Sequence, residues 1–226
     1  MKSVVFPSDH PDGLCRGVII RGQVDFKGGL ILLHAWWGLN EEIVQHADEV
    51  SRDSGFTVLV PDLYRGRIAK DRETAGHYMA DLDWEGAVCD VRAAVKCLHS
   101  NGCVKVGVAG FCMGGALCWL AAAKIPEVKA AAPFYGIPKA HLADLATISV
   151  PVQGHFGEKD NVVGLSSPRD YLPLKEKLDD AGVNFELCVY GGAGHGFAHP
   201  SYKTYNEQAA RAAFKSMYSF MRKHLQ

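Results

Sequence analysis

The sequence lacks the features that mark membrane proteins, secreted proteins and nucleic-acid-binding proteins. No uninterrupted apolar run approaches the roughly 20 residues of a membrane-spanning helix. The first residues, Met1–Asp9, have no apolar core long enough for a signal peptide. No basic block interleaves with aromatic residues, and the formal net charge is -1. We therefore expect neither a membrane partner nor a nucleic-acid partner.

The sequence also lacks paired cysteines. Its cysteines number seven, are scattered along the chain and form no Cys-x-x-Cys pair. This distribution favours a reducing compartment over a disulfide framework, so we expect a cytoplasmic protein. It also argues against a structural zinc site, whose ligands come in close pairs. Six of the cysteines are expected to be small packing residues or surface residues without a role in chemistry: Cys15, Cys89, Cys97, Cys103, Cys118 and Cys188.

The 226 residues are 48% hydrophobic and 22% charged, which suits one globular domain over residues 1–226. Strand-like and helix-like segments alternate, which predicts an α/β fold with a mainly parallel sheet and helices on both faces. The expected strands are Val18–Gln23, Leu30–His34, Phe56–Val60, Cys103–Ala109, Lys129–Tyr135, Val150–Phe156 and Phe185–Tyr190. The expected helices are Glu41–Ser54, Trp84–Leu98, Ala116–Ala123, Tyr171–Ala181 and Tyr205–Lys223. In such sheets the ligand binds at the carboxyl ends of the strands.

The stretch Gly110–Gly115 reads Gly-Phe-Cys-Met-Gly-Gly and lies between an expected strand and an expected helix. A strand, a sharp Gly-x-Cys-x-Gly turn and a helix together are typical of a nucleophile elbow. The glycines let strand and helix approach each other closely. We therefore predict that Cys112 is a nucleophile, and its alternative role is that of a small buried residue.

Two further residues follow strands at the same end of the sheet. Asp160 lies in a Gly-Glu-Lys-Asp-Asn loop, and His195 lies in Gly-Gly-Ala-Gly-His-Gly-Phe. Glu158 is a competing candidate for the acid because it lies nearer the end of its strand. The order Cys112, Asp160, His195 is the chain order of the α/β-hydrolase triad. His195 would move the proton, and Asp160 would hold the imidazole in one tautomer.

An oxyanion hole would complete such a site. The backbone N–H of Met113, directly after the nucleophile, is one expected donor. A second is expected from the loop His34–Asn40, at the N–H of Trp36. Met113 also opens a helix, whose positive end favours a nearby thiolate or oxyanion.

Five short motifs resemble those of the dienelactone hydrolase family and occur in that family's order: Trp37-Gly38-Leu39-Asn40, Pro61-Asp62-Leu63-Tyr64, Gly110–Gly115, Phe134-Tyr135-Gly136 and Gly194-His195-Gly196-Phe197. The resemblance covers nearly the whole chain. It implies an α/β-hydrolase fold, a Cys112–Asp160–His195 triad, no metal or other cofactor, and a monomeric enzyme acting on a small-molecule ester or lactone. The family's named activity is carboxymethylenebutenolidase, the hydrolysis of dienelactone. Substrate contacts are expected from Trp37, Arg72, Tyr135, Phe197 and His199.

The sequence departs from the family at two places. The family's oxyanion loop carries a glutamate that helps to take the thiol proton, whereas this chain has Ala35 there. Glu41 and Glu42 follow at the start of a helix, where they are expected to be first-turn charges, and His34 is another conceivable stand-in. These departures keep open a weakly active or non-catalytic ligand-binding protein on the same fold.

The second departure concerns the family's clamp for the substrate carboxylate. Gly196 stands at the position of a hydroxyl and His199 at the position of an arginine, and Arg72 is the arginine that remains. Because an arginine clamps a carboxylate bidentately, this loss makes a less charged ester or lactone as good a substrate as the anionic one. The polar segment Arg65–Asp81 is a candidate lid or pocket wall. A redox-sensing role for Cys112 is a third hypothesis.

Overall fold

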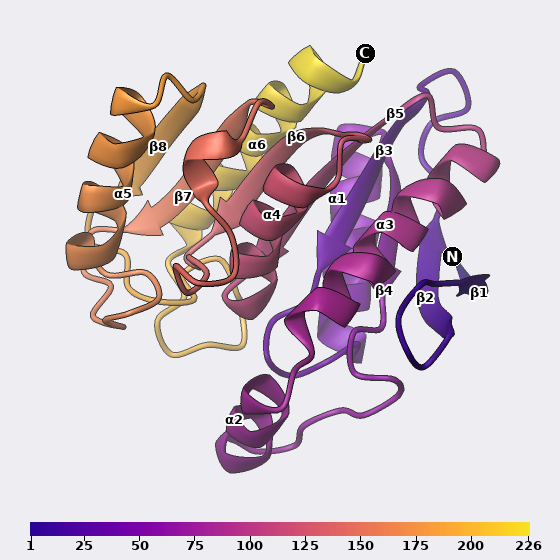
Figure 1. The fold of residues 1–226 in the computed structure, drawn as a ribbon, viewed down its shortest axis with the longest axis horizontal. Helices are drawn as coiled ribbons and strands as arrows, with labels where there is room; N and C mark the ends of the chain where they lie inside the picture. The colour runs from indigo at the N-terminus through magenta and orange to yellow at the C-terminus, as the bar shows by residue number, and fades with distance from the viewer.

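A computed structural model describes residues 1–226, and Figure 1 shows them wrapped around one eight-stranded sheet. The strands are β1 (Lys2–Pro7), β2 (Leu14–Ile20), β3 (Gly28–Leu33), β4 (Thr57–Pro61), β5 (Lys105–Phe111), β6 (Val128–Phe134), β7 (Val152–Gly157) and β8 (Phe185–Tyr190). Their spatial order is β1-β2-β4-β3-β5-β6-β7-β8. β1, β2 and β4 pair antiparallel, and every pair from β4 to β8 is parallel. The predicted mainly parallel sheet is therefore confirmed.

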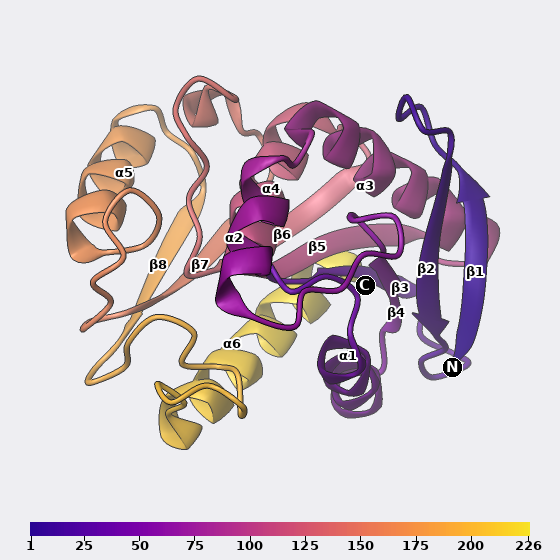
Figure 2. The ribbon, with the colours of Figure 1, turned by 90° about the horizontal axis from the view of Figure 1, so that it is seen from below.

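Helices cover both faces of the sheet, as expected. They are α1 (Glu41–Ser54), α2 (Arg72–Ala80), α3 (Trp84–Ser100), α4 (Met113–Lys124), α5 (Pro168–Asp180) and α6 (Glu207–Leu225), with a short 3-10 turn at Leu145–Thr147. Figure 2 shows α1 and α6 on one side of the sheet and α3, α4 and α5 on the other. Each side has its own apolar cluster. None of the helices is both long and apolar enough to cross a membrane.

Helix ends are set by local chemistry that the sequence displays. The Asn40 side chain accepts a hydrogen bond from the N–H of Ile43 and so caps α1, and Gly55, with φ 81°, ends it. Asp83 caps α3 in the same way through the N–H of Gly86. α5 begins at Pro168, three residues before its expected start, because proline is favoured in the first turn of a helix.

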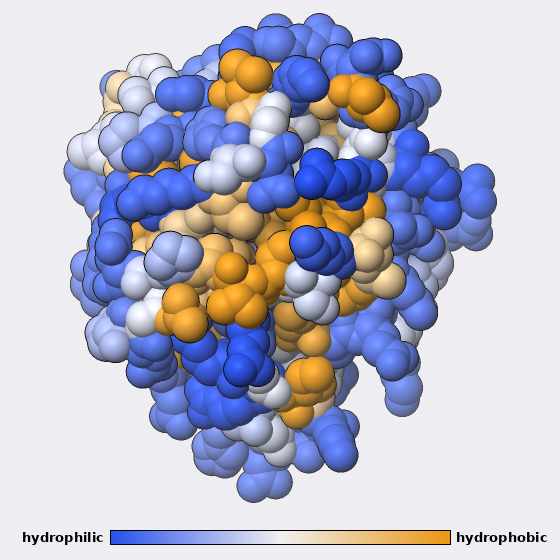
Figure 3. Space-filling view, turned by 90° about the vertical axis from the view of Figure 1, so that its right-hand side faces the viewer, coloured by the Kyte–Doolittle hydropathy of each residue, from blue (hydrophilic) through white to orange (hydrophobic).

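Three elements differ from the expectation. β1 was not predicted, and β2 spans Leu14–Ile20 instead of Val18–Gln23, because the chain turns away after Ile20. α2 forms in the polar segment between β4 and α3, which was expected to be a lid or a pocket wall and for which no helix was predicted. β1 and β2 carry exposed Val5 and Leu14, and Figure 3 shows apolar side chains gathered among polar ones on this side of the molecule.

Candidate active site

Cys112 lies at the turn between β5 and α4 in a backbone conformation that side chains rarely adopt. Its φ is 52° and its ψ is -110°. The turn is pinned on both sides, because the N–H of Cys112 donates to the Phe134 carbonyl at 3.0 Å and its carbonyl accepts from Ala116 at 3.0 Å. A Cβ at Gly114 would lie 2.5 Å from the Leu33 carbonyl oxygen, so only glycine lets α4 pack this closely on β3. The sequence motif thus folds as the predicted elbow.

The structure brings the three predicted catalytic side chains together. His195 Nε2 lies 3.4 Å from Cys112 Sγ, and His195 Nδ1 lies 2.9 Å from Asp160 Oδ2. The other carboxylate oxygen, Oδ1, accepts from the N–H of Val162 at 3.0 Å, which fixes the orientation of the Asp160 carboxylate. Asp160 follows β7 and His195 follows β8, at the carboxyl ends of adjacent strands. The imidazole therefore contacts the thiol through one ring nitrogen and the carboxylate through the other.

The loop acids have distinct places. Glu158, the competing candidate, accepts a hydrogen bond from the N–H of Gly192 at 2.9 Å and makes no bond to His195. Asp160 is therefore the acid in contact with the imidazole. Ser166 is a second partner that sequence reasoning missed, because its Oγ lies 2.9 Å from the same Nδ1. Ser166 is fully buried in the loop after β7, and a serine in a loop carries no sequence signal for such a contact.

The surroundings favour the protonated form of His195. Burial lowers its pKa, but the hydrogen bonds to Asp160 and Cys112 and the negative charges on both outweigh burial. The pKa of His195 is raised from 6.5 to about 9 as a result. An imidazolium beside a thiolate is the state in which a cysteine nucleophile is activated and a leaving group can receive a proton.

The two backbone N–H groups predicted as oxyanion donors have no acceptor in secondary structure. Met113 is the first residue of α4, so its N–H has no acceptor within the helix. The N–H of Trp36 has no acceptor in the protein, and Trp36 lines the same cavity as Cys112. Met113 is held from behind, since Tyr64 Oη lies 2.9 Å from its sulfur.

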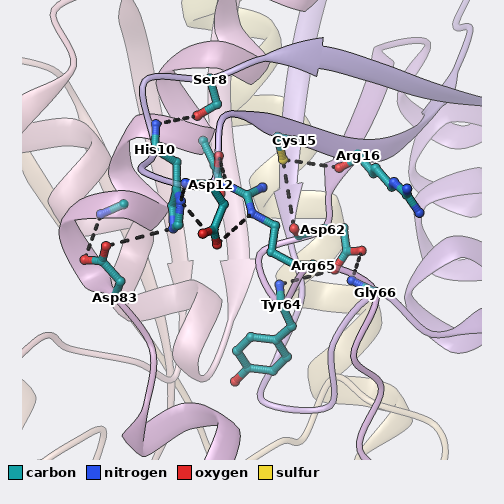
Figure 4. A network of polar contacts seen from close by, with 12 residues as sticks. Ser8, His10, Asp12, Cys15, Arg16, Asp62, Tyr64, Arg65, Gly66 and Asp83 are labelled. Atoms are coloured by element: carbon teal, nitrogen blue, oxygen red, sulfur yellow. Dashed lines mark hydrogen bonds and ion pairs between the residues drawn. The ribbon is translucent and has the colours of Figure 1, made fainter.

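A polar network fixes the loop that carries Tyr64 (Figure 4). The Asp62 carboxylate accepts from the N–H groups of Tyr64 and Gly66, at 3.2 and 2.6 Å. Arg65, which lies between Tyr64 and Gly66, has a φ of 56°. Its guanidinium donates a hydrogen bond to the Asp90 carboxylate at 2.9 Å, and Asp90 is fully buried in α3. The network therefore supports Met113, the residue that follows Cys112, through Tyr64.

Cys112 and His195 lie in the wall of a cavity of about 1110 Å³. They line it together with Trp36, Trp37 and residues of several further segments. Those include Arg72 and Met79 of α2, Trp84 of α3, Ile137–Lys139, Asn161–Leu165 and Ser201–Thr204. The segment Arg65–Asp81 therefore contributes a wall of the pocket through α2. A smaller groove of about 420 Å³ lies between α1 and α6 and contains no triad residue.

Of the five residues expected to contact substrate, Trp37 and Arg72 line this cavity. The other three do not line it. Tyr135 and Phe197 are fully buried. The Tyr135 ring packs on the imidazole of His195, with ring centres 5.2 Å apart, and Phe197 packs on Tyr135 at 5.4 Å. His199 is buried and its Nδ1 bonds Glu42 at 3.0 Å. These residues support the site from behind its wall.

The structure holds no simple replacement for the family's glutamate at Ala35. Glu42 lines the cavity, but the hydrogen bond from His199, opposed by burial and joined by one from Ser201, lowers the pKa of Glu42 to about 2. Such a carboxylate is a weak base for a thiol proton. His34 is fully buried, and both of its ring nitrogens bond the backbone, at Ala35 and Leu63. Among these titratable side chains, only His195 is in contact with the Cys112 thiol.

The structure bears on two other kinds of site, a metal site and a redox-active cysteine pair. No group of three or more His, Cys, Asp or Glu side chains is arranged to hold a metal ion. Cys118, the cysteine nearest Cys112 in sequence, is fully buried inside α4. Burial raises the pKa of its thiol well above the usual range, which disfavours a thiolate that could pair with Cys112.

Comparison with known proteins decides the family. The model of the dienelactone hydrolase family matches residues 17–225. This chain belongs to the dienelactone hydrolase family. Protein usf of Aquifex pyrophilus is 31% identical over 225 residues, which is 92% of this chain and 95% of that protein. A candidate carboxymethylenebutenolidase of Aquifex aeolicus is 29% identical over the same coverage.

Solved structures agree on the α/β-hydrolase fold of this dienelactone hydrolase family member. The crystal structure of a candidate dienelactone hydrolase from Klebsiella pneumoniae superposes with a TM-score of 0.85. It covers 99% of both chains at 23% sequence identity.

Proposed function

We propose that this dienelactone hydrolase family member hydrolyses small carboxylic esters or lactones through Cys112, His195 and Asp160. The observation that carries the proposal is the continuous contact from Cys112 Sγ through the imidazole to the Asp160 carboxylate, at 3.4 and 2.9 Å. Asp160 contacts Nδ1 of the imidazole and Cys112 contacts Nε2. Asp160 can therefore hold the ring in one tautomer while Nε2 exchanges a proton with the thiol.

The proposed reaction has two steps, acylation of Cys112 and hydrolysis of the thioester. His195 Nε2 takes the thiol proton, and the Cys112 thiolate attacks the carbonyl carbon, so that a C–S bond forms and the carbonyl electron pair moves to oxygen. The N–H groups of Trp36 and Met113 bind this oxyanion. When the C–O bond breaks, the imidazolium gives its proton to the leaving oxygen. Water, deprotonated by His195, then cleaves the thioester and restores the thiol.

The cavity indicates a substrate with apolar bulk. Large apolar side chains such as Trp37, Met79 and Trp84 line it. The family's carboxylate clamp is incomplete, since Gly196 replaces the hydroxyl and His199 is bonded to Glu42. We therefore propose uncharged or weakly charged esters and lactones as substrates beside anionic ones.

The test is turnover of a panel of activated esters and lactones by the parent and by Cys112→Ala. We expect Cys112-dependent turnover of at least one substrate. Equal rates for parent and Cys112→Ala on every substrate would refute the proposal. Cys112→Ser keeps a nucleophilic oxygen in the same place and asks whether the site depends on the more acidic thiol.

The second candidate is a protein that binds such ligands without turnover. Ala35, buried at the position of the family's glutamate, favours it. In that case Ala35→Glu should create activity that the parent lacks. A parent that already turns over esters with Cys112 dependence excludes this candidate.

A further inference from the structure

The hydroxyl of Tyr202 is a hydrogen-bond donor without an acceptor in the wall of the active-site cavity. Tyr202 belongs to the loop between β8 and α6 and lines the cavity together with Cys112, His195 and Trp36. Its Oη accepts a hydrogen bond from the indole Nε1 of Trp37 at 2.5 Å. An indole N–H can only donate, so the phenol's own proton remains available, and no protein group accepts it.

The Tyr202 ring is fixed in place on three sides. It stacks on His199, with ring centres 4.8 Å apart and planes 16° apart, and His199 is itself held by Glu42. It lies against Gly196, where a Cβ would come within 2.3 Å of a ring carbon of Tyr202. Trp37 fixes the hydroxyl end. The phenol therefore occupies the space that a side chain at position 196 would need.

Tyr202 lines the same cavity as Cys112, Trp36 and Trp37. The Trp37 indole that binds it belongs to the residue directly after Trp36, whose backbone N–H points to no protein acceptor. Burial, partly offset by the Trp37 hydrogen bond and reinforced by the negative charge of Cys112, raises the pKa of Tyr202 to about 12. The phenol thus keeps its proton and can donate it in a hydrogen bond.

We propose that the Tyr202 hydroxyl is a third donor of the oxyanion hole, beside the N–H groups of Trp36 and Met113. The role rests on the proposed hydrolysis. When the Cys112 thiolate attacks the carbonyl carbon, the carbonyl electron pair moves to oxygen, and the phenol donates a hydrogen bond to that oxygen without giving up its proton. A donor held by its neighbours before the reaction needs no reorganisation, which is the condition for strong transition-state stabilisation. The role also explains why position 196 is glycine, because any side chain there would collide with the Tyr202 ring.

The variant Tyr202→Phe removes only the hydroxyl and keeps the ring stacked. We expect kcat and kcat/KM on the best activated ester to fall together, about 100-fold, because the lost bond acts only in the transition state. Inhibition by an aryl trifluoromethyl ketone, whose adduct with Cys112 mimics the tetrahedral intermediate, should weaken by a similar factor. Tyr205→Phe is the matched control, since Tyr205 lies three residues on in the same loop but outside this cavity. It should change neither quantity.

A rise of KM in Tyr202→Phe with unchanged kcat would overturn the proposal and make the phenol a ground-state binding group. Equal effects of Tyr202→Phe and Tyr205→Phe would overturn it as well. Thermal melting of both variants shows whether a loss comes from unfolding instead. Failure of the hydrolysis itself is recognised separately, because Cys112→Ala would then match the parent before any tyrosine is changed.

Discussion

Replacing Asp160 by asparagine perturbs the electrostatics of the site with little change in shape. The Asp160 carboxylate is buried, and its Oδ2 lies 2.9 Å from His195 Nδ1. The hydrogen bond to Asp160 is the largest contribution that raises the His195 pKa against burial. A pKa raised from 6.5 to about 9 corresponds to about 3 kcal/mol in favour of the imidazolium. Asp160→Asn removes much of this preference.

We expect two kinetic consequences. The alkaline limb of the pH–rate profile should move to lower pH by at least about 1 unit, because the charge that holds the His195 proton is gone. The rate should fall as well. In serine triads the same change costs about 10⁴-fold in kcat, but here Ser166 Oγ lies 2.9 Å from the same ring nitrogen and can accept its proton. The loss should therefore be smaller, about 10²- to 10³-fold.

The free energy of unfolding should also decrease as pH rises, for the same reason. The folded protein keeps the His195 proton up to a pKa of about 9, whereas the unfolded chain releases it near 6.5. The imidazolium therefore stabilises the fold fully below about pH 6.5, and this contribution is lost as pH rises through about 9. Asp160→Asn should flatten this part of the dependence, as measured by urea unfolding at several pH values.

Glu158→Gln is the matched control, because Glu158 lies in the same loop and bonds the backbone of Gly192 instead of the imidazole. It should leave the alkaline limb where it is. The reasoning is refuted if Asp160→Asn leaves the limb unmoved, or if Glu158→Gln moves it equally.

Three further predictions concern the framework around the nucleophile. Gly136→Ala should destabilise the fold by more than about 2 kcal/mol and lower activity, since its Cβ would lie 1.9 Å from the Cys112 carbonyl oxygen; an unchanged melting temperature would contradict this. Arg65→Met should lower the free energy of unfolding in urea by about 3–5 kcal/mol, because it leaves the fully buried Asp90 carboxylate without its cation. Adding Asp90→Asn should recover part of that loss. Trp119→Phe should cost about 1–3 kcal/mol, because the Gly136 carbonyl loses the indole N–H at 3.0 Å; a calorimetric cost near zero would show that another donor replaces it.

Much of the site could be predicted because its signals are local. The elbow has glycines at fixed offsets from Cys112, and those glycines are required by backbone contacts of 2.4 to 2.6 Å at Gly110, Gly114 and Gly115. The alternation of strands and helices predicts the parallel sheet, and the sheet brings Asp160 and His195 to the same edge as Cys112.

The missed features depend on contacts between distant parts of the chain. Tyr202 meets Trp37 across 165 residues, and Ser166 meets His195 across 29, so neither pairing leaves a pattern in the sequence. His199 was assigned to substrate binding only because it stands where the family has an arginine. In the fold its Nδ1 bonds Glu42, a residue in the first turn of α1. β1 is an edge strand with only Phe6 buried, so its apolar pattern is weak.

The central claim is that Cys112 carries the acyl group during turnover. The direct measurement is mass spectrometry of the peptide that contains position 112, after brief mixing with an activated ester and rapid quenching in acid, in the parent and in Cys112→Ala. The account predicts an acyl adduct on Cys112 that turns over in the parent and none in Cys112→Ala, which should be inactive. Ester turnover without an adduct on Cys112, or undiminished turnover by Cys112→Ala, would contradict it.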